Sequence, residues 1–230
     1  MHTHPEAEAP TCAPAFVRNL TFQTNDLGKE ATLVLIFQSD KDCTYRKSFP
    51  VIWRATTFGD EGRYSMHATY TNDLAFSRVQ VVDGNVVSAG TYVKINNGQQ
   101  TTLTKTGLEF KFSAPKQGVP GYLQATNKTD AAQDIAISIM VPGDPMPKPV
   151  LCFKDVEDGC DFKAKFTPKL HAYISSDHQE TAILEGSICT DSIWEQDLAK
   201  LPESSTFTLS REPATGHYTI TNEDKSTVLR

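Results

Sequence analysis

The chain has 230 residues, of which 39% are hydrophobic and 22% are charged, and its formal net charge is −6. This apolar content is enough for a packed core and excludes a wholly disordered chain. The acidic balance argues against a nucleic-acid partner, because phosphate binding needs a basic surface. No run reaches the roughly 18 apolar residues of a membrane span, so we expect no membrane partner.

The amino-terminal segment, residues 1–14, contains proline, glutamate, alanine and threonine without periodicity, and we predict a flexible tail. It lacks the basic and apolar regions of a signal peptide. A location inside the cell and a secreted location with the signal already removed both stay open.

Five cysteines are scattered along the chain: Cys12, Cys43, Cys152, Cys160 and Cys189. The odd number and wide spacing favour free thiols over a disulfide scaffold. The third and fourth cysteines flank a short acidic loop, so they could pair in an oxidising compartment. Two N-glycosylation sequons begin at Asn19 and Asn127, and they matter only for a secreted chain.

Residues 15–141 predict a first antiparallel β-sandwich domain. Short runs alternate apolar and polar residues, as strands with one buried face do, and residues 63–70 show this most clearly. Asp83-Gly84 and Asn96-Asn97-Gly98 each lie between two such runs. These residue types tolerate the positive φ of tight hairpin turns. Short strands with turn signals at about ten-residue spacing favour a sandwich or barrel.

Residues 142–149 contain four prolines and predict a stiff linker, because prolines cannot join a central sheet or a helix. A long loop inside one sandwich is the alternative. Residues 150–230 predict a second domain, in which residues 192–201 predict a short helix, since Ser192 and Glu195 have capping-box spacing. The expected fold is therefore all-β: two antiparallel β-sandwich (immunoglobulin-like) domains with one short helix in the second.

Motifs of common enzymes are absent from the sequence. It has no phosphate-binding glycine loop, no G-x-S-x-G, no H-E-x-x-H and no C-x-x-C. We therefore expect a protein that is not an enzyme. A hydrolase that uses paired carboxylates or a bound metal is the alternative.

Closely spaced carboxylates form the first candidate site. Asp155, Glu157, Asp158 and Asp161 surround Gly159 and could offer oxygen ligands to Ca²⁺ or Mg²⁺. The spacing differs from that of an EF-hand loop. The alternative is a solvated acidic turn.

Aromatic rings and histidines form the second set of candidates, because such side chains can line a pocket and hold the polar edge of a ligand. Histidines lie beside tyrosines on two predicted strands, and the two tryptophans offer flat contact area. The candidate ligand-binding residues are Trp53, Trp194, His171, Tyr173, Tyr64 and His67. The alternatives are core packing for the tryptophans and sheet-surface positions without a partner for the histidines.

Several stretches resemble a poorly characterised family of β-rich fruiting-body proteins of mushroom-forming fungi. They are FPVIW at residues 49–53, GRYSM at 62–66, QQTTL at 99–103, YISSD with QETA at 173–182, and IWEQDL at 193–198. The resemblance covers most of residues 15–222. It implies a homodimer that holds a small heterocyclic chromophore, and it assigns no binding residue.

The first hypothesis for function is thus a non-enzymatic protein that binds a small molecule, such as a pigment, in a groove between its two domains, where ligand sites are common. The second hypothesis is a sugar-binding lectin or a defence protein.

Overall fold

The computed structural model describes residues 16–38, 45–176, 178–186 and 191–223. These residues form eighteen strands and one short 3-10 helix, η1 (Leu198–Lys200). The predicted all-β class is confirmed. In this described part of the chain, no helix has the length and apolar character needed to cross a membrane.

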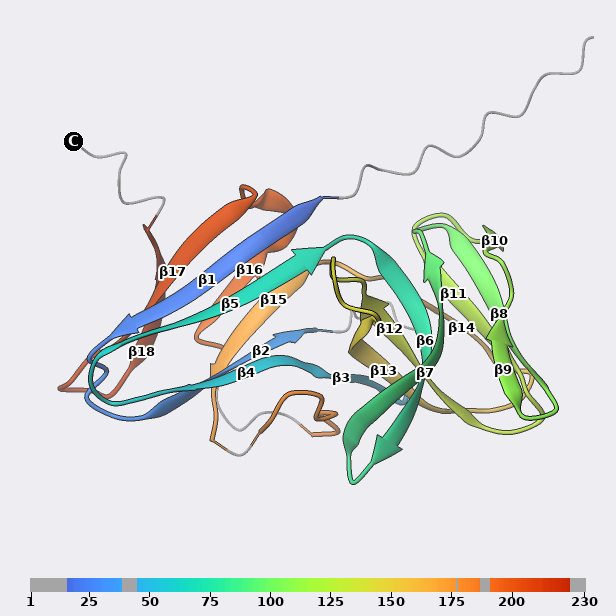
Figure 1. The fold of residues 1–230 in the computed structure, drawn as a ribbon, viewed down its shortest axis with the longest axis horizontal. Helices are drawn as coiled ribbons and strands as arrows, with labels where there is room; N and C mark the ends of the chain where they lie inside the picture. The colour runs from blue at the N-terminus through green and yellow to red at the C-terminus, as the bar shows by residue number, and fades with distance from the viewer. Residues whose placement is uncertain (1–15, 39–44, 177, 187–190, 224–230) are drawn as a thin grey trace, which may run out of the picture.

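Two four-stranded sheets form one half of the molecule, which we call the terminal lobe because both ends of the described chain contribute to it (Figure 1). The β1 sheet has the order β18-β17-β1-β5, formed by Tyr218–Asn222, Ser204–Arg211, Val17–Asn25 and Arg63–Thr71. The β2 sheet has the order β16-β15-β2-β4, formed by Trp194–Asp197, Lys169–Ile174, Ala31–Phe37 and Ile52–Phe58.

Two five-stranded sheets form the other half, which we call the central lobe (Figure 1). The β12 sheet has the order β3-β13-β12-β6-β7, formed by Ser48–Pro50, Lys148–Val156, Gln133–Ile139, Leu74–Val82 and Asn85–Ile95. The β8 sheet has the order β10-β8-β11-β14 with β9 on β8, formed by Lys116–Gln117, Gln99–Thr106, Leu123–Lys128, Asp161–Ala164 and Glu109–Phe112.

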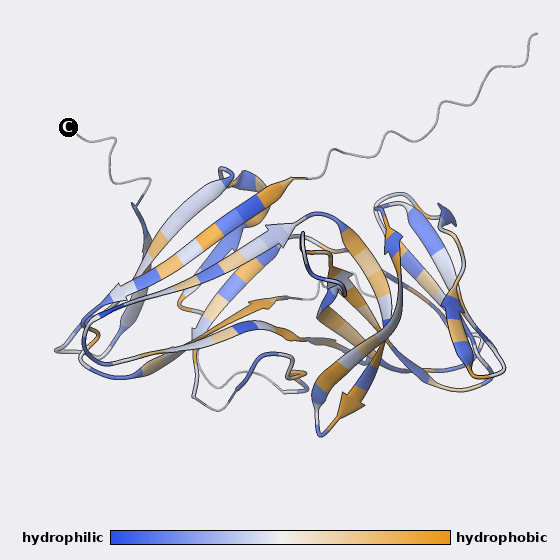
Figure 2. Ribbon diagram, viewed as in Figure 1, coloured by the Kyte–Doolittle hydropathy of each residue, from blue (hydrophilic) through white to orange (hydrophobic). Residues whose placement is uncertain are grey.

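Strand alternation explains why these segments form two-layered lobes. In β1, Leu20 and Phe22 are buried while Asn19 and Thr21 point outward, and Figure 2 shows the same bands of hydropathy along the strand. Each buried side chain of this size contributes about 1.5–3 kcal/mol by leaving water. A strand with period-two alternation therefore presents one face to a second sheet.

Aromatic rings join the two layers of each lobe. In the terminal lobe the ring of Trp194 in the β2 sheet lies 5.7 Å from that of Phe22 and 4.9 Å from that of Phe207, both in the β1 sheet. In the central lobe the rings of Phe153 and Phe162 are 4.3 Å apart across the layers. One continuous buried cluster extends through both lobes.

The boundary predicted at residues 142–149 does not divide the sheets. Every one of the four sheets combines strands from before and after it, and Lys148 and Pro149 belong to β13. Pro149 is accommodated because it lies opposite Ser138, beside a register shift of the β12–β13 pair, and sheets tolerate proline at bulges. The central lobe is instead built from one contiguous stretch, β6 to β14, with β3 added at its edge.

The helix predicted over residues 192–201 is wrong. Residues 194–197 form strand β16, which pairs with β15, and η1 adds a single turn capped by Asp197, whose Oδ1 accepts the N–H of Ala199. The hydroxyl of Ser192 donates to the carbonyls of Ala172 and Trp194 instead of capping a helix. Packing of the Trp194 ring between the sheets outweighs the local helical signal.

Two further expectations need correction. The pairing is not purely antiparallel, because β1 pairs with β17 and β8 pairs with β11 in parallel. The Asp83-Gly84 hairpin is confirmed, with β6 and β7 paired on either side of it. Asn96-Asn97-Gly98 is not a hairpin turn, because it carries the chain from the β12 sheet to the β8 sheet. The immunoglobulin-like arrangement is not confirmed.

Candidate functional site

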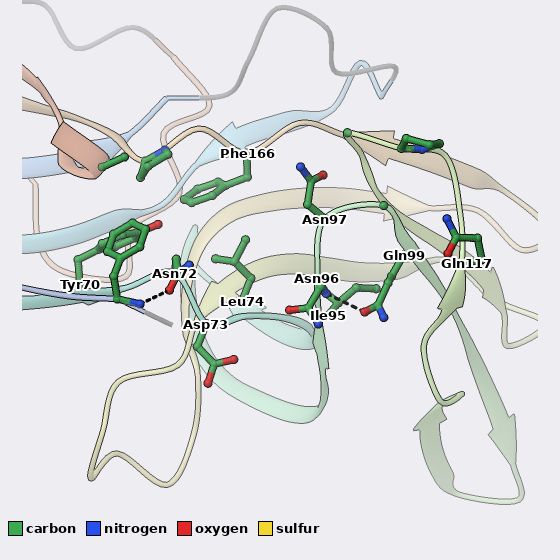
Figure 3. Close-up of a pocket in the computed structure, with 16 residues that line it drawn as sticks. Tyr70, Asn72, Asp73, Leu74, Ile95, Asn96, Asn97, Gln99, Gln117 and Phe166 are labelled. Carbon is green, nitrogen blue, oxygen red and sulfur yellow. Dashed lines mark hydrogen bonds between the residues drawn. The ribbon is translucent and has the colours of Figure 1, made fainter. Parts of the chain in front are cut away.

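A cavity of about 670 Å³ lies where the two lobes meet (Figure 3). Each lobe supplies one part of its lining. The terminal lobe and the segment that leads into it contribute apolar and aromatic side chains, and the central lobe contributes a group of side-chain amides. Pockets with this mixture, placed between structural units, are the usual sites of small-molecule binding.

The aromatic wall consists of Phe16, Tyr70 and Phe166. The rings of Phe16 and Tyr70 are 5.9 Å apart, and the buried ring of Phe37 lies 5.6 Å from both Tyr70 and Phe166. The backbone N–H of Phe16 donates to Oδ1 of Asn72 at 2.7 Å. Burial raises the pKa of Tyr70 above its ordinary value, so its hydroxyl stays protonated. This wall is therefore rigid and uncharged.

The amide wall comes from the turn after β7 and from β8 and β10. Its side chains belong to Asn96, Asn97, Gln99 and Gln117. The N–H of Asn96 donates to Oε1 of Gln99 at 2.9 Å, which leaves the Nε2 donors of Gln99 available. Among the described residues the side chains of Asn97 and Gln117 have no hydrogen-bond partner. Each amide can both donate and accept.

The turn at Gly98 holds the amide wall in place. Gly98 has a φ of +83°, which favours glycine. Its N–H donates to the carbonyl of Tyr122 at 2.8 Å, and its carbonyl accepts the N–H of Gly118 at 2.8 Å. The turn is thus fixed to the loop between β10 and β11.

Charge is nearly absent from the cavity. Asp73 is the one charged residue in its described lining, and its Oδ2 lies 2.6 Å from Nζ of Lys94. Because that carboxylate already has its own cation, the cavity suits an uncharged ligand. The aromatic wall could contact a flat apolar group, and the amides could hydrogen-bond a polar edge.

None of the six predicted ligand-binding residues lines this cavity. Trp53 is 3% exposed, and its ring lies 5.1 Å from that of Phe37 in the core. The Trp194 ring packs edge-on against both Phe22 and Phe207, which stack on each other. For both tryptophans the alternative interpretation, core packing, agrees with the structure.

His171 and Tyr173 lie on the same face of β15, opposite to Leu170 and Ala172, and both are buried. The Tyr173 hydroxyl accepts a hydrogen bond from Nε2 of Gln38 at 3.1 Å. Nε2 of His171 is buried and has no hydrogen-bond partner among the described residues, and Nδ1 lies 3.8 Å from Oε2 of Glu195. Burial lowers the pKa of His171, an effect that Glu195 opposes.

The lowered pKa of His171 predicts a loss of stability in mild acid. The imidazole of His171 binds a proton more readily in the unfolded chain than in the folded chain. The free energy of unfolding is therefore highest above the unfolded pKa of about 6.5, and it falls as the pH drops below that value. We expect the melting temperature to drop between pH 7 and pH 5, and to drop less in His171→Gln. Calorimetric scans at several pH values measure the melting temperature. An equal drop in wild type and in His171→Gln would contradict this role of His171.

Tyr64 and His67 lie on β5, away from the cavity. Tyr64 is 43% exposed, and a methyl group on Gly59 would come within 2.4 Å of its hydroxyl oxygen, so the phenol lies against that glycine. His67 is exposed on the outer face, and its Nδ1 is 3.1 Å from the hydroxyl of Thr21. The structure places His171 and Tyr173 on one face of β15, but it does not gather the six candidates into one site.

The acidic turn between β13 and β14 does not assemble a metal site. Lys47 pairs with Asp155 at 2.8 Å and lowers the pKa of that carboxyl. Oδ1 of Asp158 accepts the N–H of Asp130 at 2.9 Å, and Asp161 accepts from Thr126. Glu157 is exposed. No three potential ligands gather anywhere in the described residues. The geometry therefore favours the solvated turn over a Ca²⁺ or Mg²⁺ site.

Cysteine chemistry is also limited. Cys152 and Cys160 are free thiols, so the pair considered from the sequence is not a disulfide. Burial raises the pKa of Cys152 to about 12, which makes it unreactive. Cys12, Cys43 and Cys189 lie outside the described residues.

The cavity residues gave little signal in the sequence. Tyr70 and Phe166 resemble ordinary core aromatics. Asn96-Asn97-Gly98 has the residue types of an ordinary turn, and its amides line the cavity because this turn joins two sheets. Family models, curated proteins and solved structures were all compared with this chain, and none matches it significantly.

Proposed function

We propose that this protein is a non-enzymatic binder of a small uncharged organic molecule, held in the cavity between its lobes. One observation carries the proposal: opposite walls of the cavity, aromatic on one side and amide on the other, come from different lobes. A ligand that contacts both walls gains apolar burial and directed hydrogen bonds together.

A planar heterocyclic pigment is the ligand that would agree both with the two cavity walls and with the sequence resemblance. We propose that the sequence resemblance to fruiting-body proteins extends to the pink chromoprotein of oyster mushrooms, and we propose a homodimer on the same ground. A flat ring suits Tyr70 and Phe166, while polar ring substituents suit Asn97 and Gln117. The proposal includes no catalytic step.

Native mass spectrometry and the absorption spectrum of protein from its natural source test the proposal. We expect a retained small molecule, and about tenfold weaker retention in Phe166→Ala and in Asn97→Ala, since losing about 1.4 kcal/mol of contact lowers affinity tenfold. Gln80→Ala, which changes an exposed amide on β6, is the matched control. A colourless protein with nothing bound would oppose the proposal, and sedimentation of the same sample as single chains would refute the dimer.

Carbohydrate binding, as in a lectin, is the second candidate. The side-chain amides of Asn97 and Gln117 and the free Nε2 donors of Gln99 support it, because carboxamides match paired sugar hydroxyls. A glycan array separates the two functions. Binding of soluble sugars that is lost in Asn97→Ala would favour the lectin over the pigment carrier.

A further inference from the structure

The aromatic wall of the cavity contains one polar side-chain group, the hydroxyl of Tyr70. Phe16 and Phe166, the other members of this wall, present only rings. Tyr70 is the next-to-last residue of β5, where the alternation of the strand turns its side chain inward. In Figure 3 its hydroxyl oxygen points toward the Phe166 side of the cavity. A ligand at this wall would therefore meet a hydroxyl as well as rings.

The Tyr70 hydroxyl has no hydrogen-bond partner among the described residues, although the residue is only 1% exposed. Other tyrosines that pack into the fold are bonded. The hydroxyl of Tyr173 accepts from Gln38, and that of Tyr45 donates to backbone carbonyls at 2.7 and 2.8 Å. Buried polar groups in folded proteins nearly always have a partner, because an unpaired one is costly. Tyr70 thus holds a hydrogen-bonding group that the fold itself does not use.

This hydroxyl faces the cavity and not the closed core. Tyr70 lines the cavity, and its hydroxyl oxygen keeps a little accessible surface. Trp53 gives the contrast. Its ring lies 5.1 Å from that of Phe37, on which Tyr70 also packs, but it does not line the cavity, and its Nε1 is enclosed without a partner. Of these two unpaired groups, only the Tyr70 hydroxyl can meet a ligand.

The Tyr70 hydroxyl is a donor in search of an acceptor. Burial raises its pKa above the ordinary value, and the carboxylate of Asp197 adds to this effect, so the phenol keeps its proton near neutral pH. A phenol donates more strongly than it accepts, because its ring withdraws the oxygen lone pairs. The N–H of Phe16 is already taken by Asn72. The aromatic side of the cavity thus offers a proton to a ligand atom with a lone pair.

We propose that Tyr70 is the specificity-determining residue of the cavity and that its ligand carries a hydrogen-bond acceptor, a ring carbonyl oxygen or a ring nitrogen, in its flat part. This inference rests on the proposed function and narrows it from planar molecules in general to those with an acceptor at the aromatic wall. An aromatic hydrocarbon of the same size would cover the hydroxyl and leave it unpaired. A site with a buried donor discriminates against such a ligand.

Three flat, neutral, bicyclic probes of similar size test the inference. Quinoline carries a ring nitrogen and coumarin a ring carbonyl, whereas naphthalene has no acceptor. Ligand-observed NMR titrations of the full chain at neutral pH measure their dissociation constants. We expect wild type to bind quinoline and coumarin about tenfold more tightly than naphthalene, as one hydrogen bond provides. In Tyr70→Phe, which keeps the ring and removes only the hydroxyl, this preference should disappear while naphthalene binds as before.

Matched variants separate this role from other effects. Tyr64→Phe removes the same hydroxyl from an exposed position on the same strand, outside the cavity lining, and should keep the preference. Phe166→Ala should weaken all three probes alike. An unchanged preference in Tyr70→Phe would overturn the inference, and binding of all three probes in that case would leave the proposed function standing. Wild type that binds none of the probes would instead contradict the proposed function, and this inference with it.

Discussion

Replacing Phe22 by alanine is expected to lower the free energy of unfolding by about 3–5 kcal/mol, as for other buried aromatic truncations. The side chain is fully buried in the terminal lobe. Its ring stacks on Phe207 at 5.2 Å and meets the edge of Trp194 at 5.7 Å. Removing it leaves a cavity between two sheets that cannot collapse fully. Urea denaturation of the purified variant measures the loss.

Two comparisons make this result specific. Phe22→Leu refills most of the space and should lose clearly less than the alanine variant. Leu108 lies in the β8–β9 turn and is 94% exposed, so Leu108→Ala should stay within about 0.5 kcal/mol of wild type. A loss below about 1 kcal/mol for Phe22→Ala would show that the two sheets do not pack on this ring.

Replacing Asn127 by alanine is expected to cost about 2–4 kcal/mol, because each buried polar group left unpaired costs about 1–3 kcal/mol. Asn127 is fully buried at the end of β11. Its Nδ2 donates to the carbonyls of Ala131 and Val156, both at 2.7 Å, and its Oδ1 accepts from Thr129. The Val156 carbonyl would lose its side-chain donor, and the Ala131 carbonyl would keep only the hydroxyl of Thr129, at 3.0 Å. Thermal and urea unfolding measure the change.

The sequon at Asn127 therefore has a structural role. A glycan on this buried amide would require the turn to open, so we expect no modification there in folded protein. Asn19, which is exposed on β1, is the matched comparison: Asn19→Ala loses one surface hydrogen bond and should change stability little. A near-neutral Asn127→Ala variant, or a glycan found at Asn127, would contradict this assignment.

Local sequence pattern predicted the strands well wherever a strand buries one face. The alternation at residues 63–70 matches β5, in which Met66, Ala68 and Tyr70 are buried and Ser65 and His67 are exposed. The Asp83-Gly84 turn was predictable because positive φ is a property of its own residues. These features depend on neighbours in sequence, and so does the all-β class.

Contacts between segments distant in the sequence decided which strands pair and how the sheets pack. The pairing of β1 with β17, nearly the whole chain apart, put both ends of the described chain into one lobe. The same long-range packing made β16 a strand, since the Trp194 ring gains more between two sheets than local helix formation offers.

The candidate site shows most clearly the difference between what local sequence pattern predicts and what long-range contacts decide. The sequence supplied residues capable of binding, such as Trp53 and His171, but period and spacing cannot tell a core ring from a pocket ring. The cavity exists because Asn96-Asn97-Gly98 crosses between sheets and faces Tyr70 and Phe166 from the other lobe. The sequence alone thus determined the strands that have a clear two-residue alternation, such as β5, and which of their side chains turn inward. Only the tertiary structure decided which of those strands meet, because that choice depends on packing between surfaces that are remote along the chain.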